Sequence, residues 1–86
     1  MNSDSDRIDR LLGDVRWSLQ QAIKKHAPMH SVHEGYAVIL EEVDELWDEV
    51  KRQTIDDGAM RKEALHVAAM AVRFLLDIGS EGGGEG

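Results

Sequence analysis

The feature that most constrains the fold is a row of apolar residues between Ser31 and Gln53 that recur at alternating spacings of four and three. This period is that of one face of an α-helix packed against another helix. The row consists of Tyr36, Leu40, Val43, Trp47 and Val50, and it is widened by Val32, Ile39 and Leu46. The pattern predicts a helix over this stretch that forms part of a helical bundle.

Similar patterns precede and follow this stretch. Residues 5–26 show the same alternation, and Pro28 ends the helix that they predict. Residues 59–78 carry two neighbouring apolar rows rich in alanine, and Gly79 is a natural stop for a third helix. Because one neighbour cannot cover so wide an apolar face, we expect the third helix to be central, in contact with its own chain and with a second subunit.

The second and third helices begin with capping signals. Ser31 and Glu34 form a capping box, in which Ser31 accepts from the amide three residues on and Glu34 reaches back to the amide of Ser31. Asp56 or Asp57 is a suitable cap for the third helix. The connection before Ser31 is short, so we expect the first two helices to be antiparallel neighbours.

The sequence therefore predicts an all-α fold, with three antiparallel helices in a single domain over residues 1–79. The glycine-rich tail, residues 80–86, is expected to be disordered. A chain of 86 residues buries only about 60–65% of the surface that its unfolded form exposes. We therefore expect the chain to assemble into a homodimer or homotetramer with a four-helix type of bundle.

The composition restricts where the protein works and what it binds. The chain has no cysteine, a charged N-terminus and no apolar run near the roughly 20 residues of a membrane span. We therefore expect a cytoplasmic protein without a membrane partner. A net charge of −7 argues against binding a nucleic acid polymer, because the phosphates would be repelled. An acidic chain can still bind a polyanion through metal ions.

Acidic residues on two of the predicted helices have the spacing of metal ligands. Glu41, Glu42 and Glu45 lie within about one turn of the second helix, and Glu63 and His66 are one turn apart on the third. If these helices pack antiparallel, the four glutamates would gather enough carboxylate oxygens to bind Mg²⁺ or Mn²⁺. The same spacing also occurs on solvated acidic helices that bind no metal.

Two short motifs carry a resemblance to a known family. Glu41-Glu42-Val-Asp-Glu45, followed by Glu63-Ala-Leu-His66, resembles the paired EExxE and ExxD motifs of the MazG-like all-α nucleoside triphosphate pyrophosphohydrolases. The resemblance covers residues 31–78. It implies a helical bundle that binds Mg²⁺, or Mn²⁺, and hydrolyses a ribonucleoside or deoxyribonucleoside triphosphate to the monophosphate and pyrophosphate.

The resemblance also implies roles for individual residues. Glu41, Glu42, Glu45 and Glu63 take the metal-ligand positions, and Glu41 or Glu42 is the candidate catalytic base. His66 stands where the family has aspartate, and its imidazole nitrogen suits Mn²⁺, Ni²⁺ or Zn²⁺ better than Mg²⁺. The change either retunes the metal site or marks a non-catalytic relative that acts as a helical oligomerisation or interaction module.

Three further residues are candidates for binding the substrate, each with a structural alternative. Arg73 would suit a phosphate, or would form a salt bridge to Asp77 one turn on. Lys24, like its neighbour Lys25, would meet a phosphate or complement the helix dipole. Trp17, which lies off the main apolar row of its helix, would stack on a nucleobase or lie at a subunit interface.

Overall fold

A computed structural model describes residues 3–79 of the chain. The glycine-rich tail that the sequence predicts to be disordered lies outside the described residues. Within them every regular element is helical: α1 (Ser3–Lys25), α2 (Val32–Val50), α3 (Asp57–Phe74) and a π-helical turn, η1 (Leu75–Gly79), which continues α3. The predictions of an all-α chain and of three helices are therefore confirmed. None of these helices is both long enough and apolar enough to cross a membrane.

The helix starts follow from local capping. Ser31 Oγ accepts a hydrogen bond from the Glu34 amide at 3.0 Å, and Asp56 Oδ1 accepts one from the Ala59 amide at 3.0 Å. These contacts confirm both predicted caps. One detail of the capping box is wrong, because the Glu34 carboxylate accepts from the amide of His30 at 2.6 Å and not from that of Ser31. His30 directly precedes the N-cap residue Ser31, and its amide is the one that the Glu34 side chain reaches.

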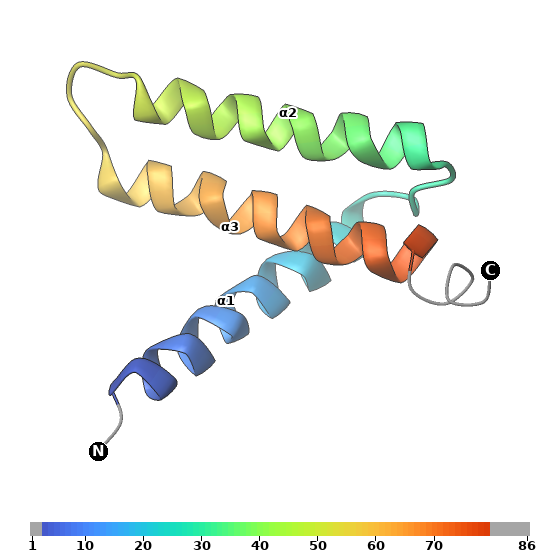
Figure 1. Cartoon of the computed structure of the whole chain (residues 1–86), viewed down its shortest axis with the longest axis horizontal. Helices are drawn as coiled ribbons and strands as arrows, with labels where there is room; N and C mark the ends of the chain where they lie inside the picture. Colours follow the sequence, from blue (N-terminus) through green and yellow to red (C-terminus); the bar gives the residue numbers. More distant parts are fainter. Residues whose placement is uncertain (1–2, 80–86) are drawn as a thin grey trace.

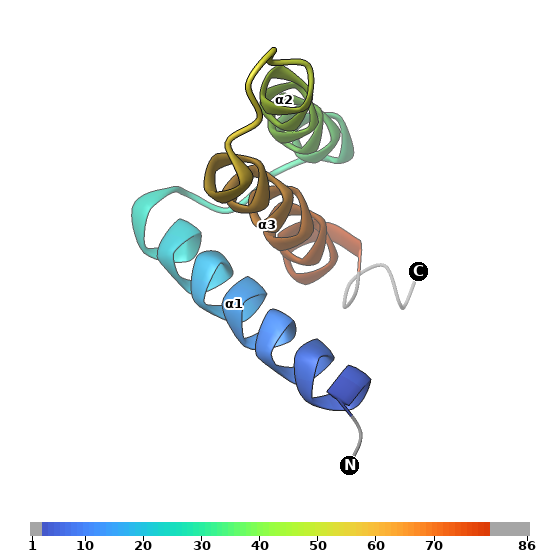
Figure 2. The same cartoon turned by 90° about the vertical axis from the view of Figure 1, so that its left-hand side faces the viewer.

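The three helices form two packed pairs that share α3. Figures 1 and 2 show α3 between α2 and α1, with α2 antiparallel to α3 and α1 crossing α3 on the other side. The central position of α3 is as predicted. The expectation that the first two helices are direct neighbours is wrong, because both pack on α3 and the connection between them passes the C-terminal end of that helix.

Small residues allow α3 to lie close to its neighbours. Ala69, in the C-terminal half of α3, has no exposed surface. Gly35 of α2 is buried, and a Cβ atom at this position would lie 2.5 Å from Cδ2 of the Phe74 ring. The Phe74 ring can therefore approach the α2 backbone only because residue 35 is a glycine.

A buried ion pair fixes α1 against α3. Arg73 is only 4% exposed, and its Nε donates to Asp77 Oδ2 at 3.0 Å. Its two terminal nitrogens donate to the carbonyl oxygens of Ala22 and His26, both at 3.0 Å, and so satisfy acceptors at the C-terminal end of α1. Asp77 Oδ2 also accepts from the amide of Met29 at 2.9 Å. One arginine and one aspartate thus connect α1, the following loop and the end of α3.

Most of the apolar row predicted to build the bundle lies away from α3, and only Ile39 and Leu46, two of the residues that widen it, belong to the face against α3. We call the exposed part the outer row of α2, and its members are Val32, Tyr36, Leu40, Val43, Trp47 and Val50. Their exposed fractions lie between 40% and 64%. The α2 face against α3 is instead built around Gly35, Val38, Ile39 and Leu46, which are buried or half-buried. Helix α2 therefore has two apolar faces, and α3 covers one of them.

Candidate metal centre

The antiparallel pair of α2 and α3 brings four potential metal ligands together. Glu42 and Glu45 lie one turn apart on α2, and Glu63 and His66 lie one turn apart on α3. One ligand atom from each of the four residues lies within 4.8 Å of the other three. The cluster combines three carboxylates with one imidazole. The two motifs singled out in the sequence therefore meet at one place in the fold.

Two oxygen atoms in the cluster are buried without a hydrogen-bond partner. These are Oε1 of Glu42 and Oε1 of Glu63. They lie 3.5 Å and 3.3 Å from Nδ1 of His66, a charged pairing only if the imidazole is protonated. A buried carboxylate oxygen without a partner costs free energy. A cation between these oxygens would remove that cost.

The donor set fits a divalent cation of the Mg²⁺ or Mn²⁺ type. Ligand atoms on opposite sides of an ion bound at about 2.0–2.2 Å lie about 4.0–4.4 Å apart. The 4.8 Å span of the cluster is therefore a few tenths of an ångström wider than the separation of ligand atoms across a bound ion. Small side-chain rotations can close this difference. The imidazole nitrogen favours Mn²⁺ over Mg²⁺, which prefers a set of oxygens alone.

Glu41 is the one predicted ligand that the cluster does not include. It is exposed, whereas its neighbour Glu42 turns toward α3. Consecutive residues on a helix point about 100° apart, so Glu41 and Glu42 cannot both face α3 directly. Glu41 instead lines a cavity of about 760 Å³ beside the cluster. Its ligand role stays a prediction that follows from the family resemblance.

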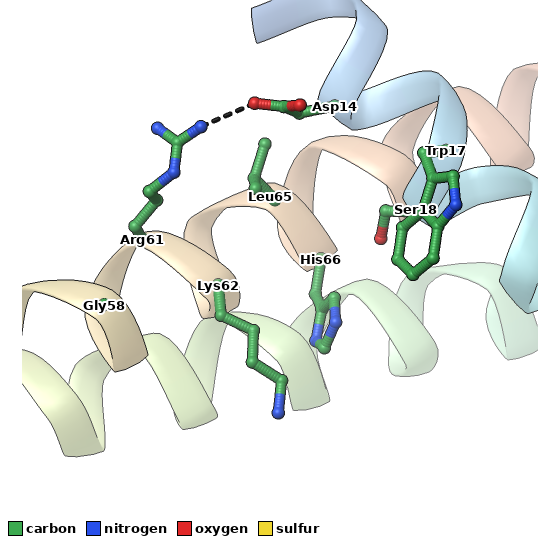
Figure 3. Close-up of a pocket in the computed structure, with 8 residues that line it drawn as sticks. All are labelled: Asp14, Trp17, Ser18, Gly58, Arg61, Lys62, Leu65 and His66. Carbon is green, nitrogen blue, oxygen red and sulfur yellow. Dashed lines mark hydrogen bonds and ion pairs between the residues drawn. The ribbon is translucent and has the colours of Figure 1, made fainter.

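A cavity of about 760 Å³ adjoins the cluster and extends toward the C-terminal half of α1. Glu42 and His66 form its boundary with the cluster, and Trp17, Lys25 and Lys62 are among the residues on its walls. A second cavity, of about 410 Å³, lies between α1 and the N-terminal half of α3 and shares Trp17, Ser18, Lys62 and His66 with the first. Figure 3 shows this second cavity, with the ion pair between Arg61 and Asp14 at one side. Both cavities are large enough for a small ligand.

Lys62 is a cavity residue that the sequence argument missed. It lies one turn before His66 on α3, and Figure 3 shows the two side chains projecting from the same side of that helix. The i, i+4 spacing from His66 was a usable signal, since such residues are neighbours on a helix surface. Lys62 brings a positive charge to a cavity that Glu41 and Glu42 also line.

The three predicted substrate-binding residues have different positions. Trp17 is 65% exposed and lines both cavities, so its ring is accessible to a ligand. Arg73 lines the larger cavity, and the salt bridge to Asp77 that we considered as its alternative role is present. Lys24 is exposed and belongs to neither cavity lining, whereas Lys25 lines the larger one. Phosphate binding by Arg73 and Lys24 stays a prediction.

The crowding of carboxylates affects the protonation of Glu45. Its pKa is raised above the ordinary value of 4.5, chiefly by the negative charge of Glu42, and also by partial burial and by Glu63, while His66 opposes the shift. A carboxyl group whose pKa is raised in the folded state contributes stability below its ordinary pKa. This contribution is lost as the pH rises through the raised value.

We therefore expect Glu45→Gln to stabilise the metal-free protein at neutral pH and to leave it unchanged near pH 4. Glutamine keeps the shape of the side chain and removes the charge that Glu42 repels. Urea unfolding in a chelator, measured from pH 4 to pH 7 for both proteins, should give midpoints that diverge in favour of the variant as the pH rises. Equal midpoints at pH 7 would show that repulsion at Glu45 has no effect on folding.

Comparisons of the chain with protein-family models, with curated proteins and with solved structures find no match. The resemblance to the MazG-like enzymes therefore rests on the two motifs themselves.

Proposed function

We propose that this protein is a metal-dependent pyrophosphohydrolase that converts a ribonucleoside or deoxyribonucleoside triphosphate to the monophosphate and pyrophosphate. The observation that carries the proposal is the convergence of Glu42, Glu45, Glu63 and His66 beside a cavity with basic walls. The proposed enzyme is cytoplasmic, uses Mg²⁺ or Mn²⁺, and works as a homodimer or homotetramer built on a helical bundle. The resemblance of the two motifs to those of the MazG-like family supports the same reaction.

In the proposed reaction the cluster would bind the metal ion and the cavity would bind the nucleotide. Glu42, Glu45, Glu63 and His66 would hold the cation, which would neutralise phosphate charge and polarise a phosphoryl oxygen. Lys25 and Lys62 on the cavity walls would add positive charge for a triphosphate, which an acidic chain otherwise repels. The exposed ring of Trp17 offers a stacking surface for the base.

Glu41 is suited to accept a proton from the attacking water. It lines the cavity but lies outside the cluster, so its carboxylate is not committed to the cation. In the proposed reaction the oxygen of a water molecule forms a bond to the α-phosphorus, and the bond from that phosphorus to the bridging oxygen breaks. The water proton passes to a glutamate, and pyrophosphate leaves.

The test is hydrolysis of a panel of standard, deoxy and modified nucleoside triphosphates with Mg²⁺ or Mn²⁺. We expect the monophosphate and pyrophosphate as products, and we expect ¹⁸O from labelled water in the monophosphate. Turnover should fall at least 100-fold in Glu42→Gln and stay unchanged in Asp48→Asn, which alters an exposed acid of the same helix outside the cluster. Release of inorganic phosphate would indicate attack at the terminal phosphorus and contradict the proposed reaction.

A non-catalytic helical module is the second candidate, because His66 occupies a motif position where aspartate is expected. That candidate predicts a protein that a divalent cation stabilises but that hydrolyses no member of the panel. Hydrolysis that appears only in His66→Asp would then identify a site that has lost catalysis. If neither cation stabilises the protein against heat, the cluster is a solvated acidic face and the proposal is wrong.

A further inference from the structure

The outer row of α2 is an apolar surface that the other described helices leave exposed, although Lys51 Nζ lies 5.9 Å from the centre of the Trp47 ring. Its six residues follow one line along the whole helix and are between 40% and 64% exposed. Tyr36 and Trp47, the two largest, are 64% and 57% exposed. Single exposed apolar residues are common on proteins, but a continuous row of this kind marks an interface. The face that packs on α3 is a different one, so the row is free to meet a second molecule.

The spacing of the row has a symmetry that points to the kind of partner. Tyr36, Leu40, Val43 and Trp47 are separated by four, three and four residues, a pattern that reads the same in both directions along the helix. A twofold axis between Glu41 and Glu42 would place Tyr36 of one copy level with Trp47 of the other. It would also place Leu40 level with Val43. A twofold interface requires a patch that is complementary to itself in this way, whereas binding to an unrelated protein does not.

We propose that the outer row of α2 binds the same row of a second copy, with the two helices antiparallel. The six side chains expose on the order of 500–600 Å² in one copy, so that a pair would bury about 1,000 Å², the lower end for a biological interface. The row contains no charged residue, which matters because each copy carries a net charge of −7. The acids of α2 lie off the row, so the contact need not bury a carboxylate.

This interface is spatially separate from the candidate metal cluster, and it gives a position for the contact between copies that the proposed function includes. Glu42 points about 120° away from Tyr36 around the helix axis, because each residue advances about 100°. The pairing therefore leaves the metal cluster and its cavity outside the contact. Loss of the interface and loss of metal binding can be measured separately.

Disulfide crosslinking tests both the surface and the direction of pairing. The natural chain has no cysteine, so introduced cysteines report on their own positions alone. We expect the double variant Tyr36→Cys with Trp47→Cys to form a covalent dimer under mild oxidation. Within one helix these two positions are about 16 Å apart, too far for an internal disulfide.

The single variants are the controls for direction. In the antiparallel pair the two copies of residue 36 are also about 16 Å apart, so neither Tyr36→Cys nor Trp47→Cys should crosslink alone. Crosslinking by either single variant would indicate a parallel pair and overturn the proposed geometry. Absence of a crosslink in the double variant, together with a monomeric natural protein by light scattering, would overturn the interface itself.

A matched pair of leucine substitutions tests which surface makes the contact. Leu40 lies on the outer row, and Leu12 is an equally apolar, exposed residue of α1. In the double-cysteine background, Leu40→Glu should reduce the crosslinked fraction at least tenfold, and Leu12→Glu should leave it unchanged. Circular dichroism should show the same helix content for both. The reverse result would place the contact between copies at α1 and contradict the proposal.

Discussion

Replacing Arg73 with methionine should lower the free energy of unfolding by about 3–5 kcal/mol, the typical loss when one partner of a buried ion pair is removed. Methionine keeps the length of the side chain but loses all its hydrogen-bond donors. The variant leaves Asp77 without its cation and the carbonyl oxygens of Ala22 and His26 without a donor. Since small domains are stable by only about 5–15 kcal/mol, this loss is a large fraction of the total stability.

Arg61→Met is the matched control for this prediction. Arg61 is also on α3 and also pairs with an aspartate of the chain, Asp14, but its side chain is 53% exposed. A surface pair contributes about 0–1 kcal/mol, so this variant should lose little. Urea unfolding at one protein concentration would measure both variants. Equal losses would contradict the view that burial of Arg73 fixes α1 to α3.

The helices and their caps could be predicted because these depend on neighbours in the sequence. The spacing of apolar residues predicts three helices, and Ser31 and Asp56 cap their helices through contacts three residues away. The same local geometry explains why most of the candidate metal cluster was predictable. Glu42 and Glu45, like Glu63 and His66, are one turn apart, so each pair shares a helix face whatever the rest of the fold does.

The apolar face of α2 that meets α3 could not be predicted from the sequence. The outer row has the larger side chains, and burial of large apolar area favours it as the core face. The structure instead places α3 against the face with Gly35, where the missing Cβ admits the Phe74 ring. That advantage depends on a residue 39 positions away, and no local pattern reveals it.

The contacts of Arg73 and of Lys24 and Lys25 also depend on how the helices pack, which the sequence does not reveal. The i, i+4 spacing allowed a salt bridge between Arg73 and Asp77, but the contacts of Arg73 with Ala22 and His26 depend on how α1 crosses α3. In the same way, Lys24 and Lys25 are equivalent in the sequence. Only the direction of α1 decides that Lys25 lines the larger cavity.

Glu63→Gln and Glu41→Gln should separate metal binding from catalysis. Glu63 has a buried oxygen without a hydrogen-bond partner inside the cluster. Its substitution should therefore remove one of the four proposed metal ligands. We expect this variant to lose most of the thermal stabilisation by Mn²⁺ and at least 100-fold in turnover. A cation that binds only the folded state stabilises it by an amount that grows with the logarithm of its affinity, so a weaker site gives a smaller rise in the melting temperature.

Glu41→Gln, in contrast, should lose turnover without losing the binding of the metal ion. Because Glu41 lies outside the cluster, its variant should keep the stabilisation by Mn²⁺. As the proposed base it should still lose about 10²–10⁴-fold in turnover, the usual contribution of general base catalysis. Both variants remove one negative charge from neighbouring parts of the same site, so a general electrostatic effect would change them alike. If Glu41→Gln instead loses the stabilisation by Mn²⁺, Glu41 is a ligand, as the family resemblance implies, and the cation binds a wider set than the four clustered residues.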